Sequence, residues 1–200
     1  MNCAKKLEFD SLMGKKILLY GETNTYKTYC TACFAKFLLE EKEIEPNLIS
    51  ILEFAPNLQY IKQLKIGGKI KDYYEKSLSC NYLDTEEEII PPRLNANNRK
   101  ELYHNACHNF KQTRFILQNF NNNPTPIVLI NDISIYLHLG DRNNLIKIIN
   151  ESQTFFGNAY FGKNINQRAH FATIFSLKEY MKIKHLHKNF DKSILMKESN

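Results

Sequence analysis

The strongest constraint on the fold is an apolar segment that runs through a short polar loop into a helical pattern. Residues 15–20 read KKILLY and are ended by Gly21, which is typical of a buried strand in a parallel sheet. The loop GETNTYKT covers residues 21–28, and apolar residues then recur at helical spacing from Lys27 to about Glu41. A strand that leads through a loop into a helix begins a βαβ unit, so we predict an α/β protein.

Further segments continue the alternation of strands and helices. We predict strands at 47–54, 127–132, 170–176 and 192–197, and helices at 55–65, 98–120 and 177–190. The region 67–99 is less regular, and we expect it to form an excursion outside the central sheet. The chain is therefore predicted to be a three-layered α/β/α sandwich with a mostly parallel central sheet, and residues 1–200 are predicted to form a single domain.

The loop at 21–28 has most of the features of a phosphate-binding loop. In the pattern G-x-x-x-x-G-K-[ST], backbone N–H groups wrap the phosphates, the lysine reaches the terminal ones and the hydroxyl holds Mg²⁺. The helix that follows also favours an anion at its N-terminus. We therefore predict that a nucleotide contacts the eight residues Gly21, Glu22, Thr23, Asn24, Thr25, Tyr26, Lys27 and Thr28.

One residue departs from this pattern, because Tyr26 occupies the place of the second glycine. Its Cβ and ring would crowd a backbone that has to approach phosphate, unless the ring points outward and the backbone dihedral angles stay allowed. Asn24 is a milder change, since asparagine tolerates positive φ better than other non-glycine residues.

Two acidic residues follow predicted strands at the edge of the sheet where ligands bind in such folds. Asp132 comes after four aliphatic residues, and we expect it to hold Mg²⁺ through water while the Thr28 hydroxyl is a direct ligand. Glu53 follows the second strand and could orient a water at the terminal phosphate if that strand lies beside the first one. Glu22 is the competing candidate for this role.

The segments ILLYGETNTYKT, LISILEFAPN and IVLINDIS together resemble P-loop NTPases, and within them the RecA/KaiC-type ATPases. The resemblance extends from about Lys15 to Lys197 and leaves out residues 67–99. It implies ATP with Mg²⁺ as ligand or substrate, Glu53 as the catalytic base, and Ser176 in the polar position of a later sensor strand. Such ATPases usually have glycines at positions 24 and 26, so we expect weak or altered hydrolysis.

The sequence leaves two alternatives to an ATPase or ATP-binding regulator. The chain could be a non-catalytic interaction protein that has lost nucleotide binding, or a small-molecule kinase. The kinase would place an acceptor pocket over the loop, built from residues 67–99 with Arg93. Candidates for an arginine that reaches the terminal phosphate of the same or a neighbouring subunit are Arg93, Arg99, Arg142 and Arg168.

The composition restricts the classes of partner and the cellular compartment that we expect. A net charge of +6 favours an anionic ligand only weakly, and the basic helix at 177–190 is expected to be a solvated face rather than a nucleic-acid site. Its apolar residues Leu177, Met181, Leu186 and Phe190 are expected to pack inward. No segment has the length and apolarity of a membrane span, and five irregularly spaced cysteines predict free thiols, so we expect a cytoplasmic protein. A homo-oligomer or a protein partner is compatible with the sequence.

Overall fold

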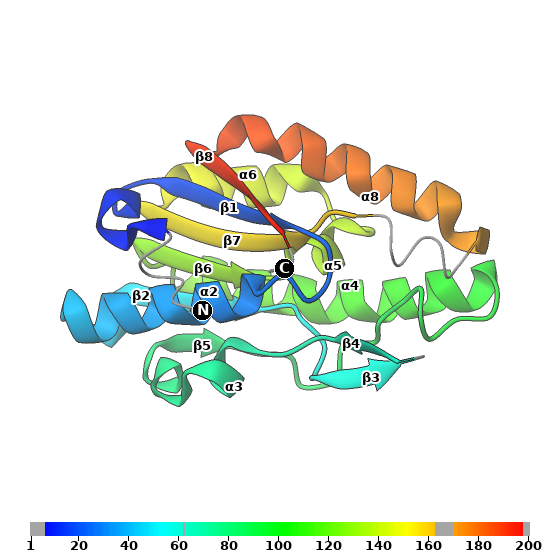
Figure 1. The fold of residues 1–200 in the computed structure, drawn as a ribbon, viewed down its shortest axis with the longest axis horizontal. Helices are drawn as coiled ribbons and strands as arrows, with labels where there is room; N and C mark the ends of the chain where they lie inside the picture. Colours follow the sequence, from blue (N-terminus) through cyan, green and yellow to red (C-terminus); the bar gives the residue numbers. More distant parts are fainter. Residues whose placement is uncertain (1–6, 62, 163–169, 198–200) are drawn as a thin grey trace.

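A computed structural model describes residues 7–61, 63–162 and 170–197. Its centre is a six-stranded sheet with the order β5-β2-β6-β7-β1-β8, in which neighbouring strands are parallel (Figure 1). β1 is flanked by β7 and β8, and two strands separate it from β2. The predicted α/β fold with a mostly parallel sheet is therefore confirmed.

The elements follow one another with short connections. The strands of the main sheet are β1 (Lys16–Gly21), β2 (Ile49–Glu53), β5 (Asn81–Leu83), β6 (Ile127–Asn131), β7 (Thr154–Tyr160) and β8 (Lys192–Met196). An antiparallel hairpin of β3 (Gln59–Ile61) and β4 (Leu64–Ile66) lies outside it. The helices are α2 (Lys27–Lys36), α3 (Ile70–Tyr73), α4 (Arg99–Asn122), α5 (Ile133–Leu137), α6 (Arg142–Glu151) and α8 (Thr173–Leu186). Shorter helical turns lie at Phe9–Leu12, Pro46–Leu48, Glu75–Ser79, His170–Ala172 and His187–Asn189, and a π-helical segment at Phe37–Glu41 extends α2.

Alternating residues of the strands enter two separate cores, one on each face of the sheet. Ile17 and Leu19 pack with Phe34 of α2 on one face, whereas Leu18 and Phe155 belong to the core under α4, α5, α6 and α8 on the other. A sheet that is buried on both faces needs strands that are apolar almost throughout, which explains runs such as IVLI in β6. The arrangement is compatible with the predicted three-layered sandwich.

Two predicted elements are wrong. Residues 55–65 do not form a helix but lead into the β3–β4 hairpin, because the apolar stripe is too short to specify a helix and Ile61, Leu64 and Ile66 pack instead against Leu94 and Tyr160. The predicted strand at 170–176 is a short helical turn followed by the start of α8. The strand that follows β6 in the chain is instead β7. Its Gly157 and Asn158 interrupt the apolar run by which a buried strand is recognised in a sequence.

We predicted that the region 67–99 lies outside the sheet, and this is wrong for part of it. Its β5 pairs in parallel with β2 and forms one edge, while α3 packs beside α2. The apolar face of α8 differs in part from expectation, because Leu177 and Met181 are exposed, whereas Leu186 is buried as predicted. Phe175 and Ile183 are buried as well.

Two further findings concern the cysteines and the membrane. Cys33, Cys80 and Cys107 are free, as predicted, but Cys30 is disulfide-bonded, so the prediction of free thiols is wrong for this residue. Irregular cysteine spacing contains no signal that would have identified it. Within the described ranges, no helix has the length and apolarity needed to cross a bilayer.

Candidate functional site

The loop at 21–28 connects the carboxyl end of β1 to the first turn of α2, as predicted. Tyr26 is the N-cap residue of α2 and adopts a left-handed conformation with φ 62° and ψ 18°. The residue is 48% exposed and lines the cavity over the loop, so its ring is not buried within the loop. Asn24 also has a positive φ of 60°. The loop therefore keeps the backbone shape that glycines would permit, at the cost of left-handed conformations at two residues that have a Cβ.

Gly21 is required by a neighbouring strand. Its φ is 149°, and a Cβ built on it would collide with the backbone carbonyl of Met196 in β8. A glycine is thus needed at this position by strand packing alone, before any ligand is considered.

Lys27 folds back over the loop that precedes it. Its Nζ donates to the carbonyl oxygens of Gly21, at 3.0 Å, and Glu22, and to Oγ1 of Thr25 at 3.1 Å. Burial lowers the pKa of Lys27 to about 8, although the charges of Asp132 and Glu22 act in the opposite direction. The lysine is therefore a half-buried cation that stabilises the loop through contacts that a phosphate could replace.

Thr28 faces an asparagine across the end of the sheet. Its hydroxyl donates to Oδ1 of Asn131, the last residue of β6, at 3.1 Å. Asn158 at the end of β7 donates to the same oxygen at 2.9 Å. The residue that contacts the predicted metal-binding hydroxyl is thus a neutral amide, one position before the predicted Asp132.

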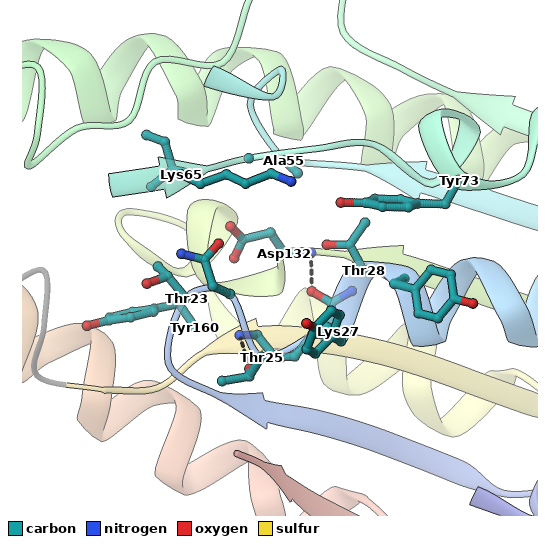
Figure 2. Close-up of a pocket in the computed structure, with 15 residues that line it drawn as sticks. Thr23, Thr25, Lys27, Thr28, Ala55, Lys65, Tyr73, Asp132 and Tyr160 are labelled. Atoms are coloured by element: carbon teal, nitrogen blue, oxygen red, sulfur yellow. Dashed lines mark hydrogen bonds between the residues drawn. The ribbon is translucent and has the colours of Figure 1, made fainter. Parts of the chain in front are cut away.

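Asp132 lies beside this pair in a half-buried position. It has φ 58°, its N–H donates to Oδ1 of Asn158 at 3.1 Å, and the Ser134 hydroxyl donates to its carboxylate. Burial raises the pKa of Asp132, while Ser134 and Lys27 counteract this. Figure 2 shows its carboxylate pointing into the cavity between Lys27 and Lys65.

Glu53 is fully buried and both of its oxygens are occupied. Asn131 Nδ2 and the N–H of Ala55, the latter at 3.3 Å, donate to Oε1, and the N–H of Ile70 and the Tyr82 hydroxyl donate to Oε2 at 2.9 and 3.0 Å. Burial raises the pKa of Glu53 to about 8, although these bonds lower it. The condition set for its role, that its strand lies beside β1, is not met, because β6 and β7 intervene. A catalytic role for Glu53 stays a prediction, and it would require the carboxyl group to leave some of these donors.

An open cavity of about 510 Å³ lies over the loop, within the size range of small-molecule sites (Figure 2). The predicted residues Thr23 to Thr28 and Asp132 line it, together with Tyr29, Ala55, Lys65, Ile66, Gly67, Tyr73, Asn158 and Tyr160. Sequence reasoning missed Asn131, Asn158 and Lys65. Asn131 could have been found, because it is the residue that directly follows the four aliphatic residues of β6.

The arginine candidates and Ser176 have other surroundings. Arg93 is 5% exposed and binds Glu179 and the Ser176 hydroxyl, and Glu179 also contacts His138 at 3.2 Å. Ser176 therefore lies in α8 and accepts a hydrogen bond from the buried Arg93, and the sensor-strand position predicted for it is wrong. Arg99 and Arg142 are exposed at the starts of α4 and α6, and Arg168 lies outside the described residues.

The chain matches no protein-family model and no curated protein sequence.

Proposed function

We propose that this protein binds a magnesium nucleotide at the loop 21–28, as a P-loop NTPase of the RecA/KaiC type would. The observation that carries the proposal is the shared cavity, in which Lys27, Thr28 and Asp132 meet over the N-terminus of α2. The helix N-terminus and Lys27 favour the phosphates, and Thr28 with Asp132 supplies oxygen ligands for Mg²⁺.

The environment of Glu53 and Asn131 favours binding over rapid hydrolysis. An amide at position 131 cannot neutralise a metal ion as a carboxylate does, and the four donors around Glu53 leave it no oxygen for a water. We therefore propose an ATP-binding regulator with weak turnover, and ATP rather than GTP is proposed on the family resemblance alone.

The small-molecule kinase is less well supported. Residues 91–94 and His138 line a second hollow beside the first, where the acceptor pocket was expected. Its volume is about 80 Å³, below that of typical ligand sites, and Glu179 already pairs with the Arg93 guanidinium. If the following experiment finds no nucleotide binding, the alternative that remains is the non-catalytic interaction protein.

The test is thermal unfolding of the purified protein as MgATP is titrated. Micromolar binding at millimolar ligand stabilises the folded state by about 4 kcal/mol. Lys27→Ala is expected to abolish the shift, whereas Lys36→Ala, at the exposed far end of the same helix, keeps it. Each variant is compared with its own ligand-free form, because Lys27 also stabilises the empty loop. No shift with any nucleotide would refute the proposal.

A further inference from the structure

The cavity has a second lysine, which comes from the β3–β4 hairpin. Lys65 lies in the middle of β4, directly opposite Tyr60 of β3 in the antiparallel pair. Figure 2 shows its side chain running along the wall of the cavity toward Ala55, above Asp132 and on the side opposite Lys27. The lysine is exposed, and no hydrogen bond or ion pair to it is found among the described residues.

The base of the hairpin is fixed to the site. Gly68 N–H donates to the Pro56 carbonyl at 2.9 Å, which closes the hairpin segment at its base. The carbonyl of Gly68 accepts from Nδ2 of Asn131 at 3.0 Å, so the residue that contacts Thr28 also holds the hairpin. A Cβ on Gly67 would collide with the backbone of residues 56 and 57, which explains the glycine at this close approach.

The hairpin is also packed on its inner side. Ile66, next to Lys65, is buried against Leu94 and Tyr160. Because successive residues of a strand point to opposite faces, burial of Ile66 directs Lys65 to the other face. The backbone of Lys65 is therefore held in place while its ammonium group remains movable over the cavity.

The position of Lys65 suits the end of a phosphate chain. In the proposed complex, Lys27 and the N–H groups at the start of α2 would contact the phosphates, and the proposed metal ligands Thr28 and Asp132 would lie beside the terminal ones. Lys65 lies across the cavity from this wall. A triphosphate bound along the wall would therefore present to Lys65 the side that Lys27 does not contact. A diphosphate lacks this terminal phosphate and would offer Lys65 no such contact.

We infer that Lys65 is a second phosphate-binding cation, which contacts the terminal phosphate of a bound nucleoside triphosphate and lets the hairpin distinguish triphosphate from diphosphate. This inference rests on the proposed nucleotide binding. It assigns to β4 the role of a fixed wall whose lysine side chain contacts the terminal phosphate.

The test compares the affinities of the wild type, Lys65→Ala and Lys65→Arg for MgATP and MgADP by calorimetry. Lys65→Ala is expected to lose about tenfold in affinity for MgATP and little for MgADP, and Lys65→Arg to retain the preference for MgATP. Lys111→Ala, which removes an exposed lysine on α4 outside the cavity, is the matched control and should bind both nucleotides as the wild type does.

The outcomes separate the two proposals. If the wild type binds both nucleotides and Lys65→Ala weakens them equally or not at all, the inference is wrong while the proposed function stands. If the wild type binds neither nucleotide, both fail. Thermal unfolding of ligand-free Lys65→Ala should match that of the wild type, which would exclude misfolding as the cause of a lost affinity.

Discussion

The Thr28 hydroxyl donates to the side-chain oxygen of Asn131 at 3.1 Å, while the amide nitrogen of Asn131 donates to Glu53. A single asparagine thus connects the start of α2 with a buried glutamate on the neighbouring strand. A carboxylate at position 131 could bind a metal ion beside Thr28, but it could not donate to Glu53.

Asn131→Asp is expected to lower the free energy of unfolding by about 2–4 kcal/mol without metal, because it removes the donor to Glu53 and Gly68 and places two carboxyl groups side by side. Excess Mg²⁺ should recover part of this loss, and more than it stabilises the wild type. Urea unfolding with EDTA and with Mg²⁺ measures both effects. The exposed loop variant Asn24→Asp serves as control, and equal stability of Asn131→Asp and wild type in EDTA would contradict the prediction.

The raised pKa of Glu53 is expected to make the stability of the protein depend on pH. Its pKa is about 8 in the folded state and near 4.5 when unfolded, so the folded state binds the extra proton between these values. The stability from this group is fully present below about pH 4.5 and is lost as the pH rises through about 8. Urea unfolding of the wild type and Glu53→Gln from pH 5 to 8 should show a decline that is reduced in the variant; parallel curves would show that Glu53 does not titrate in this range.

Tyr26→Gly is expected to stabilise the protein by up to about 1 kcal/mol, because glycine removes the left-handed strain at φ 62° while giving back some backbone entropy. Tyr26→Ala keeps a Cβ and should remain close to the wild type. The midpoints of urea unfolding of the three proteins distinguish backbone strain from ring contacts. A Tyr26→Gly protein that is less stable than Tyr26→Ala would mean that the left-handed conformation is not strained.

Nucleotide binding is expected to take up a proton near pH 8. The pKa of Lys27 is lowered to about 8 in the empty loop, and bound phosphates would raise it again, so affinity should fall as the pH rises above 8. Calorimetry in two buffers of different ionisation enthalpy measures the proton uptake. Lys27→Arg, which stays charged, should show less uptake, and Glu53→Gln tests whether the buried glutamate contributes.

Arg93→Met is expected to cost about 3–5 kcal/mol, because it leaves the buried Glu179 without its cation. The double variant Arg93→Met with Glu179→Leu should recover much of this stability. MgATP affinity of the double variant should equal that of the wild type, since Arg93 serves the ion pair; a persistent loss of affinity would assign Arg93 to the nucleotide after all.

The parts of the fold that the sequence predicted are those with a long or unambiguous pattern. β1, the loop and α2 were predicted together. The helix predicted at 98–120 is α4 almost to its ends, because 24 residues of helical spacing average out local exceptions. The β3–β4 hairpin was mistaken for a helix because Leu58, Ile61 and Leu64 fit a helical period over a short span.

Local patterns in the sequence predicted part of the candidate site. Lys27, Thr28 and Asp132 do line one cavity, as their placement at strand ends implied. Asn158 and Lys65 could not be found in this way, because β7 was not recognised and Lys65 belongs to a hairpin whose position depends on Gly68, Asn131 and Tyr160. Contacts between segments far apart in the sequence decide these placements, and no local period encodes them.

The position of β1 in the sheet also determines when the site can form. In the described chain β1 pairs only with β7 and β8, and Gly21 lies between Tyr160 and Met196 in the two registers. Both partner strands are synthesised long after β1 has left the ribosome. β1 therefore lacks its sheet partners while β2, β5 and β6 can already associate. A nascent chain that has reached β6 would contain every residue of the loop at 21–28 and still lack the strands that give this loop its shape.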